Sequence, residues 1–293
     1  MVSSRRRSYA PAWCLGAFLI AAAASAHAEY HENVEYGRPG DSSLRLDANI
    51  PDGTGPFPAA IIVHGGGWVL GDRKRSVEPL FQPLSSHGFA WFSISYRLPT
   101  DLSSNGFAAA LMLGRQIDDV RQAVAYVKGH ASEYHVDASR IALIGESAGG
   151  QLAEMAALKP ARDGAVRAVV AFYSPGDLAM LARTATFIPD SLRQVVKNSA
   201  LDGMLMAGLA DLSPVNWVRK DSPPFLLIHG TADGWVPIEQ SKLMCEKMHA
   251  VGGRCELYPV EGAGHGIRWW EAAGVTAYKE RMMSWLEKQM SGS

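Results

Sequence analysis

The sequence predicts an α/β fold in which a mostly parallel central sheet carries helices on both faces. Short apolar runs of strand length alternate along the chain with segments of helical periodicity, which is typical of this fold class. The runs are apolar throughout, as expected for parallel strands that are buried on both faces. The 293 residues are 47% hydrophobic and 19% charged, a composition and length that suit one globular domain.

The expected strands are bounded by turn residues. Pro-Gly-Asp at 39–41 separates the first two strands, and Pro-Asp-Gly at 51–53 closes the second. Most later strands are apolar runs, of which Ala-Ala-Ile-Ile-Val at 59–63 is the clearest. In chain order we expect strands at 34–37, 44–50, 59–63, 89–96, 140–144, 166–172, 225–228 and 255–259.

Helices are expected between these strands. Apolar residues recur at helical spacing within 117–127, and a similar pattern starts at Ala148 and ends before Pro160. Two more helices are expected at 237–251 and 272–290.

The stretch 174–224 breaks the alternation. It is long, irregular and lies between two expected strands. Because ligands of such sheets bind in a crevice at one edge, we expect this stretch to be a small lid over the site. An ordinary excursion of helices on the sheet face is the alternative.

The first 28 residues resemble a signal peptide. Arginines at 5–7 precede a short apolar run at 12–24, and the small-x-small pattern at 26–28 predicts cleavage after Ala28. Residues 29–293 are therefore expected to be an exported domain, periplasmic or secreted, with an uncleaved membrane anchor as the alternative. No later run is long enough to cross a membrane, and the net charge of -1 does not suggest nucleic acid as a partner.

Two cysteines, Cys245 and Cys255, remain after residue 28. Export would permit a disulfide that joins an expected helix to the next strand. Two buried free thiols are the alternative.

A candidate nucleophile, Ser147, stands in the G-x-S-x-G motif at 145–149. A strand is expected before the motif and a helix after it, which is the context of a nucleophile elbow. Glycines on both sides give the tight turn the space that it needs, and the helix N-terminus faces the developing negative charge. A glycine-rich turn without chemistry is the alternative.

The motif His-Gly-Gly-Gly at 64–67 directly follows the expected strand 59–63. Acyl transfer passes through an oxyanion, which needs preorganised N–H donors, and glycines let the backbone approach it closely. A flexible loop is one alternative. A phosphate cradle is another, although no Lys-Ser or Lys-Thr follows the glycines. We expect His64 to hold this loop by hydrogen bonds.

A serine needs a base, and the base needs an orienting acid. In this architecture the chain order is serine, acid, histidine. His265, between glycines after the last strand, is the candidate base, and Asp233, after the strand 225–228, is the candidate acid. His229 is expected to be a packed residue at the end of that strand.

Trp68 and Trp235 lie close in sequence to these motifs and are candidates for substrate binding. Packing in the core is the alternative. No ligand spacing suggests a metal site, and no dinucleotide fingerprint follows a strand, so no cofactor is expected.

Taken together, these motifs resemble the α/β-hydrolase superfamily, within its esterase and lipase branch. The resemblance runs from about residue 30 to the C-terminus. It is similar both to hormone-sensitive-lipase relatives and to the feruloyl and acetylxylan esterase-like group. It implies that the backbone amides of Gly66, Gly67 and Ala148 form the oxyanion hole. The motifs are H-G-G-G-W at 64–68, Y-R-L at 96–98, G-E-S-A-G-G at 145–150, H-G-T-A-D at 229–233, V-P at 236–237 and G-H-G at 264–266.

Three departures leave the subfamily open. Glu146 stands where hormone-sensitive-lipase relatives usually carry aspartate. Pro99-Thr100 follows the Y-R-L motif in place of Ala-Pro, and the acid loop lacks the Asp-Pro-Leu form.

The expected function is hydrolysis of a small-molecule carboxylic ester through an acyl-enzyme. An amidase, of the kynurenine formamidase or exopeptidase type, is the first alternative, because the same residues can cleave amides. A non-catalytic binding protein on a hydrolase scaffold is the second.

Overall fold

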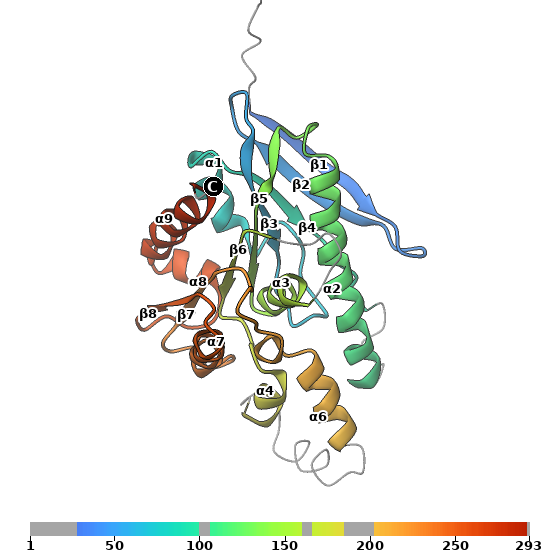
Figure 1. Ribbon diagram of the computed structural model, residues 1–293, viewed down its shortest axis with the longest axis vertical. Coiled ribbons are helices and arrows are strands. Elements are labelled where there is room, and N and C mark those ends of the chain that lie inside the picture. Colours follow the sequence, from blue (N-terminus) through green and yellow to red (C-terminus); the bar gives the residue numbers. More distant parts are fainter. Residues whose placement is uncertain (1–27, 100–105, 160–165, 185–201, 292–293) are drawn as a thin grey trace, which may run out of the picture.

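Eight strands form one sheet in the order β1-β2-β4-β3-β5-β6-β7-β8 (Figure 1). Strand β2 is antiparallel to β1 and to β4, and every other neighbouring pair is parallel. The computed structural model describes residues 28–99, 106–159, 166–184 and 202–291, so the expected signal peptide lies outside it apart from Ala28. The strands are β1 (Glu29–Gly37), β2 (Leu44–Ile50), β3 (Phe57–Val63), β4 (Ala90–Ile94), β5 (Val136–Glu146), β6 (Ala168–Phe172), β7 (Phe225–Gly230) and β8 (Cys255–Val260).

Helices cover both faces of this sheet (Figure 1). Ile61 and Ile62, neighbours in β3, are fully buried in separate apolar clusters, as expected for a strand covered on both sides. The predicted α/β class, with a mostly parallel sheet and helices on both faces, is confirmed. The cluster of Ile61 contains side chains of α2 (Gly106–Gly129), α3 (Ala148–Leu158) and α7 (Glu239–Ala250), and that of Ile62 contains side chains of α1 (Phe81–Ser86), α8 (Ile267–Ala272), α9 (Ala277–Ser291) and the 3-10 turn η1 (Glu78–Leu80).

The structure corrects some expected boundaries. The expected terminal helix at 272–290 is wrong at its start, because Ala272 ends α8 and α9 begins at Ala277. Gly274 lies between them with φ 74°, a left-handed conformation that an α-helix does not tolerate. Helix α2 begins at Gly106, well before the periodic pattern at 117–127. None of the described helices is long and apolar enough to cross a membrane.

The expected lid, 174–224, connects β6 to β7. Its described parts contain α4 (Leu178–Thr184), α6 (Asp202–Asp211) and the 3-10 turn η2 (Pro214–Asn216), whereas 185–201 lie outside the described residues. Helices α4 and α6 contact each other and lie together at one end of the molecule (Figure 1).

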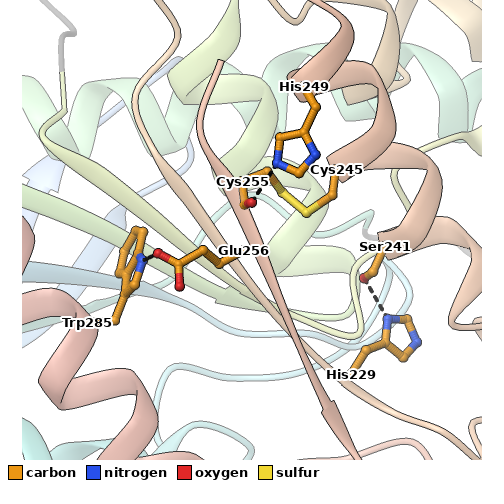
Figure 2. The surroundings of a disulfide bond; sticks show 7 residues. All are labelled: His229, Ser241, Cys245, His249, Cys255, Glu256 and Trp285. Atoms are coloured by element: carbon orange, nitrogen blue, oxygen red, sulfur yellow. Dashed lines mark hydrogen bonds between the residues drawn. A yellow bond between two sulfur atoms is a disulfide. The ribbon is translucent and has the colours of Figure 1, made fainter. Parts of the chain in front are cut away.

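A disulfide between Cys245 and Cys255 joins α7 to β8 (Figure 2). Both cysteines are buried. The sequence left open whether they pair or remain free thiols, and the structure has them paired. Beside this cross-link, His249 Nε2 lies 2.8 Å from the carbonyl oxygen of Cys255, a second contact between the helix and the strand.

The acidic side chain of Glu154, in α3, is buried in the interior at 1% exposure. Its Oε2 atom accepts a hydrogen bond from Ser174 Oγ at 2.9 Å. Burial raises the pKa of Glu154 from 4.5 to about 8, and the Ser174 hydrogen bond offsets this only in part. The folded state therefore holds this proton more tightly than the unfolded chain. Its contribution to stability is complete below pH 4.5 and is lost as the pH rises toward 8.

We therefore expect Glu154→Gln to stabilise the protein at alkaline pH. Glutamine keeps an acceptor for Ser174 and has no proton to lose, so the free energy of unfolding at pH 8 should rise by roughly 2–4 kcal/mol. Urea unfolding at pH 4 and pH 8 measures the change, which should be small at pH 4. The matched control is Glu133→Gln, which changes an exposed glutamate. An equal gain at both pH values would contradict the expectation.

Candidate active site

Ser147 lies on a sharp turn directly after β5 and directly before α3. Its backbone has φ 52° and ψ -124°, a strained conformation that costs about 1–3 kcal/mol. Its N–H donates to the carbonyl oxygen of Phe172 at 2.9 Å, which ties the turn to the end of β6. The strand–turn–helix context predicted for this serine is therefore present, with the hydroxyl-bearing residue at the positive end of α3.

Two glycines allow this turn to close. A Cβ on Gly145 would lie 2.3 Å from the carbonyl oxygen of Gly149, and a Cβ on Gly149 would lie 2.2 Å from that of His64. Both distances are well below van der Waals contact, and in each case the obstacle is backbone. The G-x-S-x-G spacing is thus required by the packing of α3 against β5 and the loop after β3.

His265 lies between Ser147 and Asp233. Its Nε2 atom is 2.9 Å from Ser147 Oγ, and its Nδ1 atom is 2.7 Å from Asp233 Oδ2. The three side chains come from the β5–α3 turn, the loop after β7 and the loop between β8 and α8. The structure thus brings together the three residues that the sequence pattern selected. With the Nδ1 proton donated to the carboxylate, Nε2 can accept the proton of the serine.

The Asp233 carboxylate is held by backbone as well as by imidazole. Its Oδ1 atom accepts the N–H groups of Trp235 and Val236, both at 2.9 Å. Burial alone would raise the pKa of Asp233, but the nearby imidazoles of His229 and His265 and the backbone hydrogen bonds lower it overall. The carboxylate is therefore ionised at neutral pH, which is the state that stabilises an imidazolium.

His229 is a neighbour of Asp233 that the sequence did not reveal. It is fully buried, as expected of a packed strand-end residue. Its Nδ1 atom lies 2.7 Å from the Ser241 hydroxyl (Figure 2), whereas Nε2 lies 2.8 Å from the Val236 carbonyl oxygen and 3.5 Å from Asp233 Oδ2. Since a carbonyl can only accept, Nε2 carries a proton, and His229 holds the loop of the acid against α7.

The glycine loop after β3 is fixed at its start. His64 Nδ1 lies 2.7 Å from the Gly65 carbonyl oxygen, and the ring stacks on Tyr96 at 4.3 Å, in line with its expected role in holding the loop. Gly66 and Gly67 have φ values of 115° and 60°. Within the part of the chain that the structure describes, the amides of Gly66, Gly67 and Ala148 donate no hydrogen bond.

The two tryptophans predicted to bind substrate differ in their surroundings. Trp68 is half-buried, donates from Nε1 to Gln151 at 3.0 Å, and packs with Leu181 of α4 and Val236. Trp235 is 64% exposed, and its ring stacks on His265 with the centroids 5.3 Å apart. Trp235 is therefore accessible beside the imidazole. Among the described residues, no group of three His, Cys, Asp or Glu side chains could hold a metal ion.

A mostly parallel sheet with a serine elbow, followed along the chain by an acid and a histidine, defines an α/β-hydrolase. The chain belongs to the BD-FAE family, whose model matches residues 46–248.

Relatives and solved structures agree with this class. The chain is 32% identical to a probable carboxylic ester hydrolase, LipM, of Mycobacterium tuberculosis, over 76% of this chain and 52% of that protein. It is 27% identical to a probable isoprenylcysteine alpha-carbonyl methylesterase, ICMEL1, of Arabidopsis thaliana, over 75% of this chain and 48% of that protein. The chain spans about half the length of the curated relatives it matches. A truncated carbohydrate esterase from gut microbiota superimposes with a TM-score of 0.72 at 25% identity, covering 92% of this chain and 99% of that one.

Proposed function

We propose that this protein is a carboxylic ester hydrolase with Ser147 as nucleophile, His265 as general base and Asp233 as orienting acid. The observation that carries the proposal is the pair of contacts of the imidazole, 2.9 Å to Ser147 Oγ and 2.7 Å to Asp233 Oδ2. The names of the esterase relatives support the reaction class.

The proposed reaction has two steps. Ser147 Oγ attacks the ester carbonyl carbon while His265 Nε2 takes the hydroxyl proton, and the amides of Gly66, Gly67 and Ala148 hold the oxyanion. The tetrahedral intermediate collapses, and the alcohol leaves with the proton from Nε2. Water then gives a proton to Nε2 and attacks the acyl group, which releases the acid and restores the serine.

A substrate panel tests this proposal. We expect the protein to hydrolyse short-chain chromogenic esters and a fluorophosphonate probe to label Ser147. Feruloyl esters, formylkynurenine and aminoacyl anilides in the same panel separate an esterase from the two amidase types. Turnover of only the amides would contradict the proposal. Folded protein with neither turnover nor labelling would instead support a binding protein on this scaffold.

The same proposal includes a lid and export. Contact of Leu181 in α4 with Trp68 and Val236 supports a lid over the site, because these two residues belong to the glycine loop and the acid loop. The arginines, apolar run and cleavage pattern at 5–28 support export, as does a disulfide, which persists mainly in oxidising compartments. A mature protein that begins at Glu29 is the expected product, and a cell-associated, uncleaved chain would contradict export.

A further inference from the structure

A chain of three hydrogen bonds lies beneath the candidate site, outside the triad. The N–H of Ile267 donates to the hydroxyl of Tyr173 at 2.8 Å, and this hydroxyl donates to Glu146 Oε2 at 2.9 Å. The other carboxylate oxygen of Glu146 accepts the N–H of Gly65 at 2.8 Å. Tyr173 is fully buried, and Glu146 is 6% exposed. Each of the three hydrogen bonds has one donor and one acceptor, so the Tyr173 hydroxyl and both carboxylate oxygens of Glu146 have partners.

The ends of this hydrogen-bond path lie in the oxyanion loop and in the loop of His265. Acyl transfer requires these two loops to keep a fixed position relative to each other. Gly65 precedes the Gly66 and Gly67 amides, and Ile267 follows His265 by two residues at the start of α8. The middle of the hydrogen-bond path lies next to the nucleophile, because Glu146 directly precedes Ser147. A single buried path therefore connects the oxyanion loop, the nucleophile turn and the loop of the base.

Tyr173 also contacts the base directly. Its ring centroid lies 4.5 Å from that of His265, so the ring packs against the imidazole while the hydroxyl holds the following helix. Burial, reinforced by the Glu146 carboxylate, raises the pKa of Tyr173 well above its ordinary value. The hydroxyl therefore stays protonated at neutral pH and can donate its hydrogen bond to Glu146.

We propose that Tyr173 and Glu146 are positioning residues that hold the oxyanion loop and the His265 loop in register across the nucleophile turn. This inference rests on the proposed function. It adds that the carboxylate before the nucleophile acts through its two hydrogen bonds and does not touch the substrate. A loss of register changes the geometry of the transition state more than the binding of the substrate, so the effect should fall on kcat.

Tyr173→Phe tests the proposal, since it removes the hydroxyl and keeps the ring against His265. We expect kcat for a short-chain chromogenic ester to fall about tenfold, with KM changed by less than about twofold. The rate of fluorophosphonate labelling should fall in parallel. Tyr278→Phe is the matched control, because Tyr278 is also fully buried and its hydroxyl bonds to a glutamate of α8, Glu271, at 2.7 Å. It should keep the wild-type kcat.

Glu146→Gln tests the same path at the carboxylate that accepts from both Tyr173 and Gly65, and it carries the test if Tyr173→Phe does not fold. It should lower kcat without changing KM, and in combination with Tyr173→Phe it should add little, since both changes break one path. Wild-type kcat in both single variants would overturn the inference, as would equal losses in Tyr173→Phe and Tyr278→Phe. A wild-type protein that neither hydrolyses esters nor takes the probe would overturn the proposed function itself. With an active wild type, the variants test the hydrogen-bonded path alone.

Discussion

Ser147→Ala is expected to lower kcat for a short-chain chromogenic ester by roughly 10⁴-fold or more. The change removes the only hydroxyl that His265 Nε2 contacts at hydrogen-bond distance among the described residues. Alanine has the same Cβ as serine, so it adds no clash to a turn that already accepts a side chain at φ 52°. The thermal melting temperature should therefore stay close to that of the wild type. Steady-state kinetics and a melting curve on the same preparation measure both effects.

The control for this change is Ser139→Ala, because Ser139 is an exposed serine of the same strand, β5. It should retain full turnover and full fluorophosphonate labelling. Substantial turnover by Ser147→Ala, in protein purified from a host without esterase background, would assign the chemistry to another nucleophile.

Asp233→Asn is expected to lower kcat by roughly 10⁴-fold while leaving the fold intact. The reason lies in the two backbone amides that bond to Oδ1, those of Trp235 and Val236. They require an oxygen at that position, so the NH₂ group of the asparagine must take the place of Oδ2 and face His265 Nδ1. The imidazole must then accept at Nδ1 and carry its proton on Nε2, where it cannot take the proton of Ser147.

Asp221→Asn is the matched control, because its carboxylate is exposed and pairs only with Arg219 in the described part of the chain. Its kcat should equal that of the wild type. Crystals of Asp233→Asn with the asparagine oxygen toward His265, or a kcat within tenfold of the wild type, would contradict the tautomer argument.

Much of the fold could be predicted because local patterns determine it. Parallel strands buried on both faces are apolar runs, and the elbow requires glycines on both sides of its serine, so both are visible in the sequence. The start of α2 was missed because the periodic pattern begins only at residue 117. The break at Gly274 was missed because a single glycine within a helical pattern is often tolerated.

The chain order of serine, acid and histidine was sufficient to select the residues that the structure brings together. Their supporting contacts could not be found in this way. Tyr173 bonds to Glu146, 27 positions away, and to Ile267, 94 positions away. No local pattern marks such a contact, because it depends on which strand ends meet at one edge of the sheet. The same is true of His229, whose approach to Asp233 depends on the path of the loop after β7.

The Cys245–Cys255 bond makes the stability of the fold around the acid depend on the redox state. Helix α7 also carries Ser241, whose hydroxyl contacts the imidazole of His229 (Figure 2). The other ring nitrogen of His229 lies 3.5 Å from Asp233 Oδ2. A cross-link that closes a loop of this length stabilises a fold by about 3 kcal/mol. Protein made in a reducing cytosol therefore carries the full set of side chains without this cross-link, and we expect it to unfold at a lower temperature than the oxidised protein.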